Sequence, residues 1–158
     1  MSSGETQGES SGPGPSPSRT TPAPAGPVDA PGPDAAARFR VLLVEDSKAV
    51  AEIFAMMLRE LGHEVRIVAT GDQALAQLPQ LHPQIVFSDI SMPGMSGYDL
   101  ARHIRQHPGA SEVYLVAMTG YGQPEDRQRS LDAGFDEHLV KPADLNRLRS
   151  VFAAAAAR

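Results

Sequence analysis

A regular alternation of short apolar segments with helical patterns, from Arg40 to the alanine-rich end, constrains the fold of this chain most strongly. The first apolar segment runs from Val41 to Val44. Large apolar residues then recur at three- and four-residue spacings until Gly62. Continuous apolar runs are typical of parallel strands buried on both faces, and the spaced residues are typical of a helix packed on one side. The pattern therefore predicts a buried strand followed by an amphipathic helix.

The same alternation occurs four more times along the chain. The further predicted strands are Val65 to Ala69, Ile85 to Ser88, Val113 to Met118 and Phe135 to Val140; the further predicted helices are Asp72 to Leu78, Tyr98 to Arg105, Glu125 to Ala133 and a last one from about Ala143. Connections this short favour right-handed crossovers, which place helices on both faces of a parallel sheet. We therefore expect an α/β, flavodoxin-like, doubly wound (βα)5 fold with five parallel strands in the order 2-1-3-4-5.

Residues 1–37 differ in composition from the rest of the chain. They are rich in Ser, Gly, Pro and Ala, and they contain almost no large apolar side chain. Such a segment cannot bury enough apolar area to offset the loss of chain entropy on folding. We therefore predict a disordered N-terminal tail over 1–37 and one folded domain over 38–158.

Overall composition excludes several classes of protein. The chain has no cysteine, and no stretch approaches the roughly 20 apolar residues that a membrane helix requires. Its formal net charge of -5 argues against a nucleic-acid-binding surface, which is normally basic. We expect a cytoplasmic protein with no membrane insertion and no direct contact with nucleic acid.

Polar residues stand at the carboxyl ends of the predicted strands. Glu45 and Asp46 follow the first strand, and Asp89 follows the third. Thr119 follows the fourth strand and Lys141 the fifth. Ligands of open α/β sheets bind at this edge, and the first and third strands flank the point where the strand order reverses. We expect these side chains to converge there.

A convergent set of this kind predicts phosphoryl chemistry. Three crowded carboxylates need a neutralising cation, and oxygen ligands suit Mg²⁺ (or Mn²⁺), which leaves coordination positions for phosphoryl oxygens. Thr119 and Lys141 can bind other phosphoryl oxygens. The nucleophile should be Asp89, because the Ser91 to Gly94 loop after it can leave its carboxylate accessible.

Each of these residues also has an ordinary structural explanation when taken alone. Asp46 and Ser47 are better explained as caps of the following helix, since both types accept hydrogen bonds from free helical N–H groups. Thr119 alone can simply end a strand, and Lys141 alone is typical of a solvated surface charge. The agreement of all the candidates at one edge of one sheet favours the functional interpretation.

Four segments of the chain resemble response regulator receiver domains of two-component systems, over roughly Arg40 to Ala154. They are Val41 to Ser47, Phe87 to Gly97, Met118 to Gly120 and Leu139 to Pro142. The resemblance implies Mg²⁺ coordination by Asp46, Asp89 and the backbone carbonyl of Ser91. It implies that Glu45 contributes to this site through water. It further implies a phosphohistidine donor on a sensor histidine kinase or a histidine phosphotransfer protein.

The resemblance also implies how such a domain works. A stand-alone, single-domain response regulator is a self-catalysing phosphoryl acceptor with slow autodephosphorylation, and it is not a conventional enzyme. It signals to a downstream protein, here unknown, when Thr119 moves and the face made by the fourth helix, fifth strand and fifth helix changes conformation. His138 stands where the family often has Tyr or Phe, which makes it the candidate switch residue. It either rotates like that ring or faces solvent permanently. The other histidines, His63, His82, His103 and His107, lack ligand spacing and are expected at the surface.

Three alternative functions compete with this interpretation. A magnesium-dependent phosphatase of the haloacid dehalogenase type needs two aspartates two residues apart after the first strand, and Glu45 to Lys48 lacks them. In a flavodoxin-like cofactor binder, Asp46 would repel the cofactor phosphate. A receiver-like interaction module without phosphorylation would have no need for Asp89, Thr119 and Lys141 together.

Overall fold

The sheet has the predicted strand order. The computed structural model describes residues 38–120 and 124–158, so the predicted tail lies outside the described residues. All strand pairs are parallel, in the order β2-β1-β3-β4-β5. The strands are β1 Arg40–Val44, β2 Glu64–Val68, β3 Ile85–Asp89, β4 Tyr114–Thr119 and β5 Glu137–Val140. This order confirms the doubly wound fold, with its reversal between β1 and β3.

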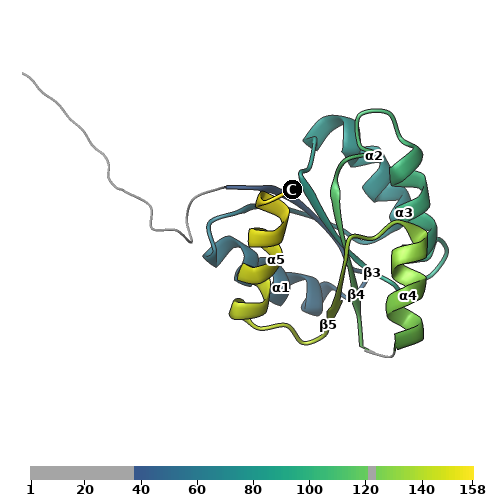
Figure 1. The fold of residues 1–158 in the computed structure, drawn as a ribbon. Helices are drawn as coiled ribbons and strands as arrows, with labels where there is room; N and C mark the ends of the chain where they lie inside the picture. Colours follow the sequence, from purple (N-terminus) through teal and green to yellow (C-terminus); the bar gives the residue numbers. More distant parts are fainter. Residues whose placement is uncertain (1–37, 121–123) are drawn as a thin grey trace, which may run out of the picture. The chain divides into compact units, whose positions relative to one another are not determined.

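The helices cover both faces of the sheet, as Figure 1 shows. On one face lie α1 and α5; on the other lie α2, α3 and α4. Their bounds are α1 Lys48–Glu60, α2 Gly71–Leu81, α3 Gly97–Gln106, α4 Pro124–Ala133 and α5 Leu145–Ala156. None of the described helices combines the length and the apolar character that crossing a membrane requires.

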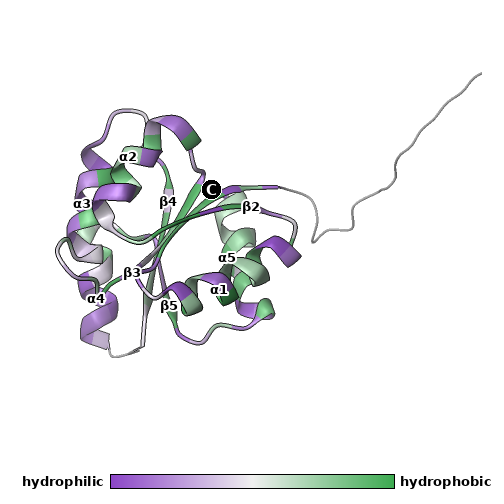
Figure 2. Cartoon of the chain, turned by 180° about the vertical axis from the view of Figure 1, so that it is seen from behind, coloured by the Kyte–Doolittle hydropathy of each residue, from purple (hydrophilic) through white to green (hydrophobic). Residues whose placement is uncertain are grey.

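The core is divided by the sheet into two apolar clusters. In β1, Leu42 packs toward α2, α3 and α4, and Leu43 packs toward α1 and α5. Phe87 and Met118 continue the second cluster from β3 and β4, and neither is more than 1% exposed. Figure 2 shows much of the strand length in apolar colours and much of the helical surface in hydrophilic ones. Because side chains alternate along a strand, a strand buried on both faces must be apolar at every position.

Several element boundaries differ from the prediction by one to three residues, and two of them have a clear physical cause. Helix α2 continues beyond Leu78 and contains Pro79, because Pro79 lies in the last turn and removes only one hydrogen bond there. His82 then ends the helix in the left-handed conformation at φ 50° and donates its N–H to the Leu78 carbonyl. Strand β5 begins two residues after Phe135, since Phe135 still donates its N–H to the Ser130 carbonyl of α4.

His63 is buried, so the prediction that it lies at the surface is wrong. The residue is 6% exposed, and its ring stacks on Phe152 of α5 with ring centroids 3.8 Å apart. Its Nδ1 accepts a hydrogen bond from the Phe39 N–H at 3.1 Å. Burial, with a smaller contribution from the Arg38 charge, lowers the pKa of His63. His82 and His103 are exposed, as predicted.

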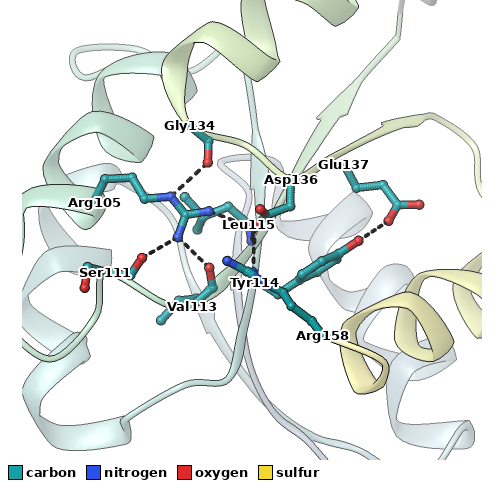
Figure 3. A network of polar contacts seen from close by, with 9 residues as sticks. All are labelled: Arg105, Ser111, Val113, Tyr114, Leu115, Gly134, Asp136, Glu137 and Arg158. Carbon is teal, nitrogen blue, oxygen red and sulfur yellow. Dashed lines mark hydrogen bonds and ion pairs between the residues drawn. The ribbon is translucent and has the colours of Figure 1, made fainter.

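A polar network fixes the edge of the sheet at which β4 and β5 begin (Figure 3). The Arg105 guanidinium of α3 donates to the carbonyls of Ser111, Val113 and Gly134. It also forms an ion pair of 2.7 Å with Asp136. One side chain therefore joins α3 to the segments that lead into β4 and β5. The polar residues predicted to be functional lie at the opposite edge.

Candidate functional site

Three carboxylates meet where β1 and β3 end. Glu45, Asp46 and Asp89 each offer a carboxylate oxygen, and these oxygens lie within 4.8 Å of one another. The two strands are neighbours in the sheet, with Val44 opposite Ser88, so parallel pairing brings their carboxyl ends together. The acidic cluster is thus a direct consequence of the strand order.

Ser47, and not Asp46, caps the helix that follows β1. The Ser47 hydroxyl accepts a hydrogen bond from the Val50 N–H at the start of α1. Glu45 accepts the Ser47 N–H through Oε2 at 3.1 Å. Because Ser47 satisfies the helix terminus, the exposed carboxylate of Asp46 has no capping role to fulfil.

Burial distinguishes the three acids. Glu45 is 3% exposed and Asp89 is 7% exposed. Asp89 accepts the Ser91 N–H through Oδ1 at 3.3 Å, which orients its carboxylate within the loop after β3. Burial raises the pKa of Glu45, and the negative charge of Asp89 adds to this effect against the hydrogen bonds from Lys141 and Ser47. Placing two buried acids beside a third costs free energy unless a cation compensates.

Lys141, directly after β5, supplies part of this compensation. Its Nζ lies 2.9 Å from Glu45 Oε1 and 3.4 Å from Asp89 Oδ2. Burial by itself would lower the pKa of the Lys141 ammonium, but the hydrogen bond to Glu45 and the charges of Asp89 and Glu45 outweigh burial and raise it. The ammonium therefore stays charged at neutral pH and faces both buried acids.

Thr119 ends β4, the strand between Asp89 and Lys141. The register pairs Asp89 with Met118, so Thr119 lies one residue further toward the site edge. The Thr119 carbonyl accepts the Lys141 N–H at 2.7 Å, and the Thr119 residue is 8% exposed. The backbone thus fixes the hydroxyl-bearing residue and the lysine relative to each other.

Gly97, the first residue of α3, packs directly on the backbone of Asp89. A Cβ atom at this position would lie 2.4 Å from the Asp89 carbonyl oxygen and 2.8 Å from the Ile90 Cα. The Gly97 N–H donates to the Ile90 carbonyl at 2.9 Å. Only a residue without a side chain lets α3 begin this close to Asp89.

The donor set fits a hard divalent cation. Carboxylate oxygens are the ligands that Mg²⁺ prefers, and Mg²⁺ usually takes one or two carboxylates together with water and phosphate oxygens. The cluster offers the exposed Asp46 and the partly accessible Asp89 for direct contact. Glu45 is already engaged by Lys141 and by the Ser47 N–H. This division suits a site that binds one cation and leaves room for a further oxygen ligand.

The sequence matches the response regulator receiver domain over residues 41–153. This chain belongs to the response regulator receiver domain family. Receiver domains are the phosphoryl-accepting domains of two-component signal transduction, and they bind Mg²⁺ and interact with histidine kinases and downstream targets. The family match covers the sheet except for its first residue, Arg40, and all four segments on which the resemblance rested.

Similar proteins place the receiver domain in different contexts. The gliding motility regulatory protein of Myxococcus xanthus is 34% identical over 107 residues, which are 68% of this chain but only 14% of that protein. The receiver domain of sensor histidine kinase PA1611 of Pseudomonas aeruginosa aligns with a TM-score of 0.71 at 30% identity, over 77% of this chain and all of that one. That structure was solved with a magnesium ion coordinated in the active site cleft. Chemotaxis protein CheY4 of Vibrio cholerae aligns with a TM-score of 0.71 at 27% identity, over 75% and 99% of the two chains.

Not every predicted residue of this receiver domain lies in the acidic cluster. His138 lies two residues before the end of β5 and is buried at 6% exposure, so it does not face solvent. Ser91 contacts Asp89 through its N–H, while the role predicted for its carbonyl stays a prediction. Residues 121–123, which follow Thr119 and Gly120 in the chain, lie outside the described residues.

Two residues that the sequence reasoning did not single out are tied to the site or to its switch position. Gly97 was placed only within the loop that resembles the family, although Ser96, a helix N-cap, signals that the next residue opens a helix. Ser130 of α4 contacts the His138 ring, and a serine within an otherwise polar helix carries no sequence signal of such a contact.

Proposed function

We propose that this receiver domain, taken as residues 38–158, accepts a phosphoryl group on the Asp89 carboxylate from a phosphohistidine of a partner protein. The observation that carries this proposal is the position of Asp89, which lies within 4.8 Å of two further carboxylates and within 3.4 Å of the Lys141 ammonium. The domain then acts in the cytoplasm as the receiver of a response regulator. Its output is a conformational change on the face made by α4, β5 and α5.

The transfer step is a substitution at phosphorus. A carboxylate oxygen of Asp89 forms the new phosphorus–oxygen bond as the phosphorus–nitrogen bond of the donor breaks, and the electron pair of that bond stays on the donor imidazole. Lys141 and the Thr119 hydroxyl bind phosphoryl oxygens as negative charge spreads over them. Attack of water on the acyl phosphate later releases inorganic phosphate and restores the carboxylate.

Asp46, Asp89 and the Ser91 carbonyl would hold the divalent cation, with Glu45 acting through water. When bound, Mg²⁺ (or Mn²⁺) neutralises the acids and draws charge from the transferring group. The Lys141 ammonium holds Glu45 in place whether or not the phosphoryl group is present, because its bond to Glu45 is the shorter of its two contacts.

A protein donor is supported by an apolar surface beside the site. Ile53 and Met56 of α1 are 62% and 66% exposed, which is unusual for large apolar residues. Ile53 lines a groove of about 360 Å³ between α1 and the segment after β5, and Lys141 lines this groove as well as the site. A histidine-bearing helix seated on this surface would present its phosphoryl group to Asp89. Small phosphodonors need no such surface.

Labelling with acetyl phosphate and Mg²⁺ tests the acceptor assignment. The wild-type chain should incorporate one acid-stable, base-labile phosphoryl group, and Asp89→Asn should abolish it. Asp132→Asn, a charge-matched change at an exposed position of α4, should label normally. Equal labelling of Asp89→Asn would show that another residue is the acceptor. Sustained turnover of a small phosphomonoester would favour the phosphatase alternative, and absence of any labelling would favour an interaction module.

A further inference from the structure

His138 faces α4 from inside the domain. It lies opposite Ala117 in the β4–β5 ladder, and Ala117 belongs to the apolar cluster that packs against α2, α3 and α4. Residues side by side in neighbouring strands point to the same face, and so do residues two apart in one strand. Therefore His138 and Thr119 share the face that α4 covers. The Thr119 side chain and the imidazole are therefore diagonal neighbours on that face.

Ser130 of α4 meets this imidazole. Ser130 is fully buried, and its hydroxyl oxygen lies 3.0 Å from the Asp126 carbonyl oxygen and 3.4 Å from His138 Nδ1. A hydroxyl has one hydrogen, and a carbonyl oxygen can only accept. For both contacts to be hydrogen bonds, the Ser130 hydrogen goes to Asp126 and His138 donates from Nδ1 at the second contact. The contact thus selects the form of the ring that carries hydrogen on Nδ1.

The backbone of His138 is held from the opposite side. Its carbonyl accepts a hydrogen bond from the Arg147 guanidinium of α5 at 3.1 Å. The same guanidinium forms an ion pair of 2.8 Å with Glu137. His138 is consequently bonded to α4 through its ring, to α5 through its carbonyl and to β4 through the sheet. A Tyr or Phe ring in its place would have no ring N–H to offer Ser130.

We propose that the hydrogen bond from His138 to Ser130 couples phosphorylation to a movement of α4. This inference rests on the proposed function, because it requires the Thr119 hydroxyl to be drawn toward a phosphoryl group on Asp89. If the imidazole follows Thr119, either its hydrogen bond to Ser130 breaks or Ser130 moves with the ring. Because Ser130 belongs to α4, the second case moves α4. Ser130 is thus a positioning residue for the α4 face, acting through His138, and takes no part in phosphoryl transfer.

Nuclear magnetic resonance of the full chain tests this coupling, with ¹⁵N label in the histidine rings and the backbone amides. Beryllofluoride, added with Mg²⁺, serves as the phosphoryl analogue. The unphosphorylated protein should show His138 with hydrogen on Nδ1, and beryllofluoride should shift the His138 ring and the α4 amides together. In Ser130→Ala the Nδ1–H signal of His138 should change, and amide exchange in α4 should rise about fivefold, the equivalent of one lost hydrogen bond. Ser111→Ala, at an exposed position, is the control and should behave as wild type.

The inference is overturned if His138 carries its hydrogen on Nε2 alone, or if Ser130→Ala leaves the His138 ring signals and the response of α4 to beryllofluoride unchanged. Failure of the proposed function gives a different result, because neither wild type nor Ser130→Ala would then bind beryllofluoride. In that case the ring tautomer and the exchange of α4 still decide whether Ser130 and His138 form the bond.

Discussion

Replacing Gly97 with alanine should disable phosphoryl acceptance while leaving the domain folded. The new Cβ would lie 2.4 Å from the Asp89 carbonyl oxygen, whereas ordinary contact begins at 3.4 Å. The obstruction is backbone and cannot rotate away, so Asp89 and the start of α3 must separate by about 1 Å. A misplacement of this size typically costs on the order of 10²-fold in rate, and we expect that loss in labelling by acetyl phosphate.

Gly71→Ala provides a matched control for this change. Gly71 is likewise the first residue of a helix that follows an N-cap, here α2 after Thr70. Its added Cβ would meet the Met95 side chain at 2.6 Å, and a flexible thioether can move aside. We therefore expect near-normal labelling from Gly71→Ala. Circular dichroism and urea unfolding would verify that both variants fold. A folded Gly97→Ala that labels at the wild-type rate would refute the reasoning.

Three further results are expected. Ile53→Glu should impair transfer from a phosphohistidine protein but not labelling by acetyl phosphate. Leu131→Glu, at an exposed apolar position on α4, should affect neither reaction. If Ile53→Glu loses activity equally with both donors, the donor protein does not dock on α1. Lys141→Met should slow labelling by about 10²-fold and yet tighten Mn²⁺ binding, measured by paramagnetic relaxation, because the acids lose their ammonium partner. Folding lowers the pKa of His63, so the unfolded chain takes up a proton first as the pH falls below about 6.5. The free energy of unfolding should therefore decline below this pH, by at most about 1.4 kcal/mol per pH unit. His63→Gln should reduce this slope in urea titrations at several pH values, while His103→Gln, at an exposed site, should retain it.

The fold was largely predictable because its signals are local. The central strands β1, β3 and β4 are short, largely apolar runs buried on both faces, and most helices carry an apolar stripe that periodicity reveals. The element order and the strand order therefore followed from the sequence. The errors lie at ends, where tertiary contacts decide. Phe135 belongs to the turn because its N–H bonds Ser130, and α2 tolerates Pro79 because the last turn has few bonds to lose.

The burial of His63 could not be predicted for a related reason. The residues next to His63 in the sequence do not indicate that Phe152, from the last helix, stacks on its ring. They also do not indicate that its Nδ1 accepts a hydrogen bond from the Phe39 N–H. Gly97 and Ser130 were missed in the same way, since each acts on a partner brought close only by folding. Strand ends are the exception, because in a parallel sheet they meet at one edge whatever the intervening helices contain.

The charge balance of the site argues that phosphoryl acceptance needs no large rearrangement of its lysine. An ammonium has three hydrogens to donate, and among the described residues Lys141 directs its Nζ to two acceptors, Glu45 and Asp89. One hydrogen therefore remains for a phosphoryl oxygen without loss of the bond to Glu45. Phosphorylation converts the Asp89 carboxylate into an acyl phosphate, in which the carboxyl group of Asp89 no longer carries its own charge. The contact between Lys141 and Asp89 therefore weakens as the contact with the phosphoryl oxygen forms. The shorter contact keeps buried Glu45 paired throughout, which avoids the cost of an isolated buried carboxylate.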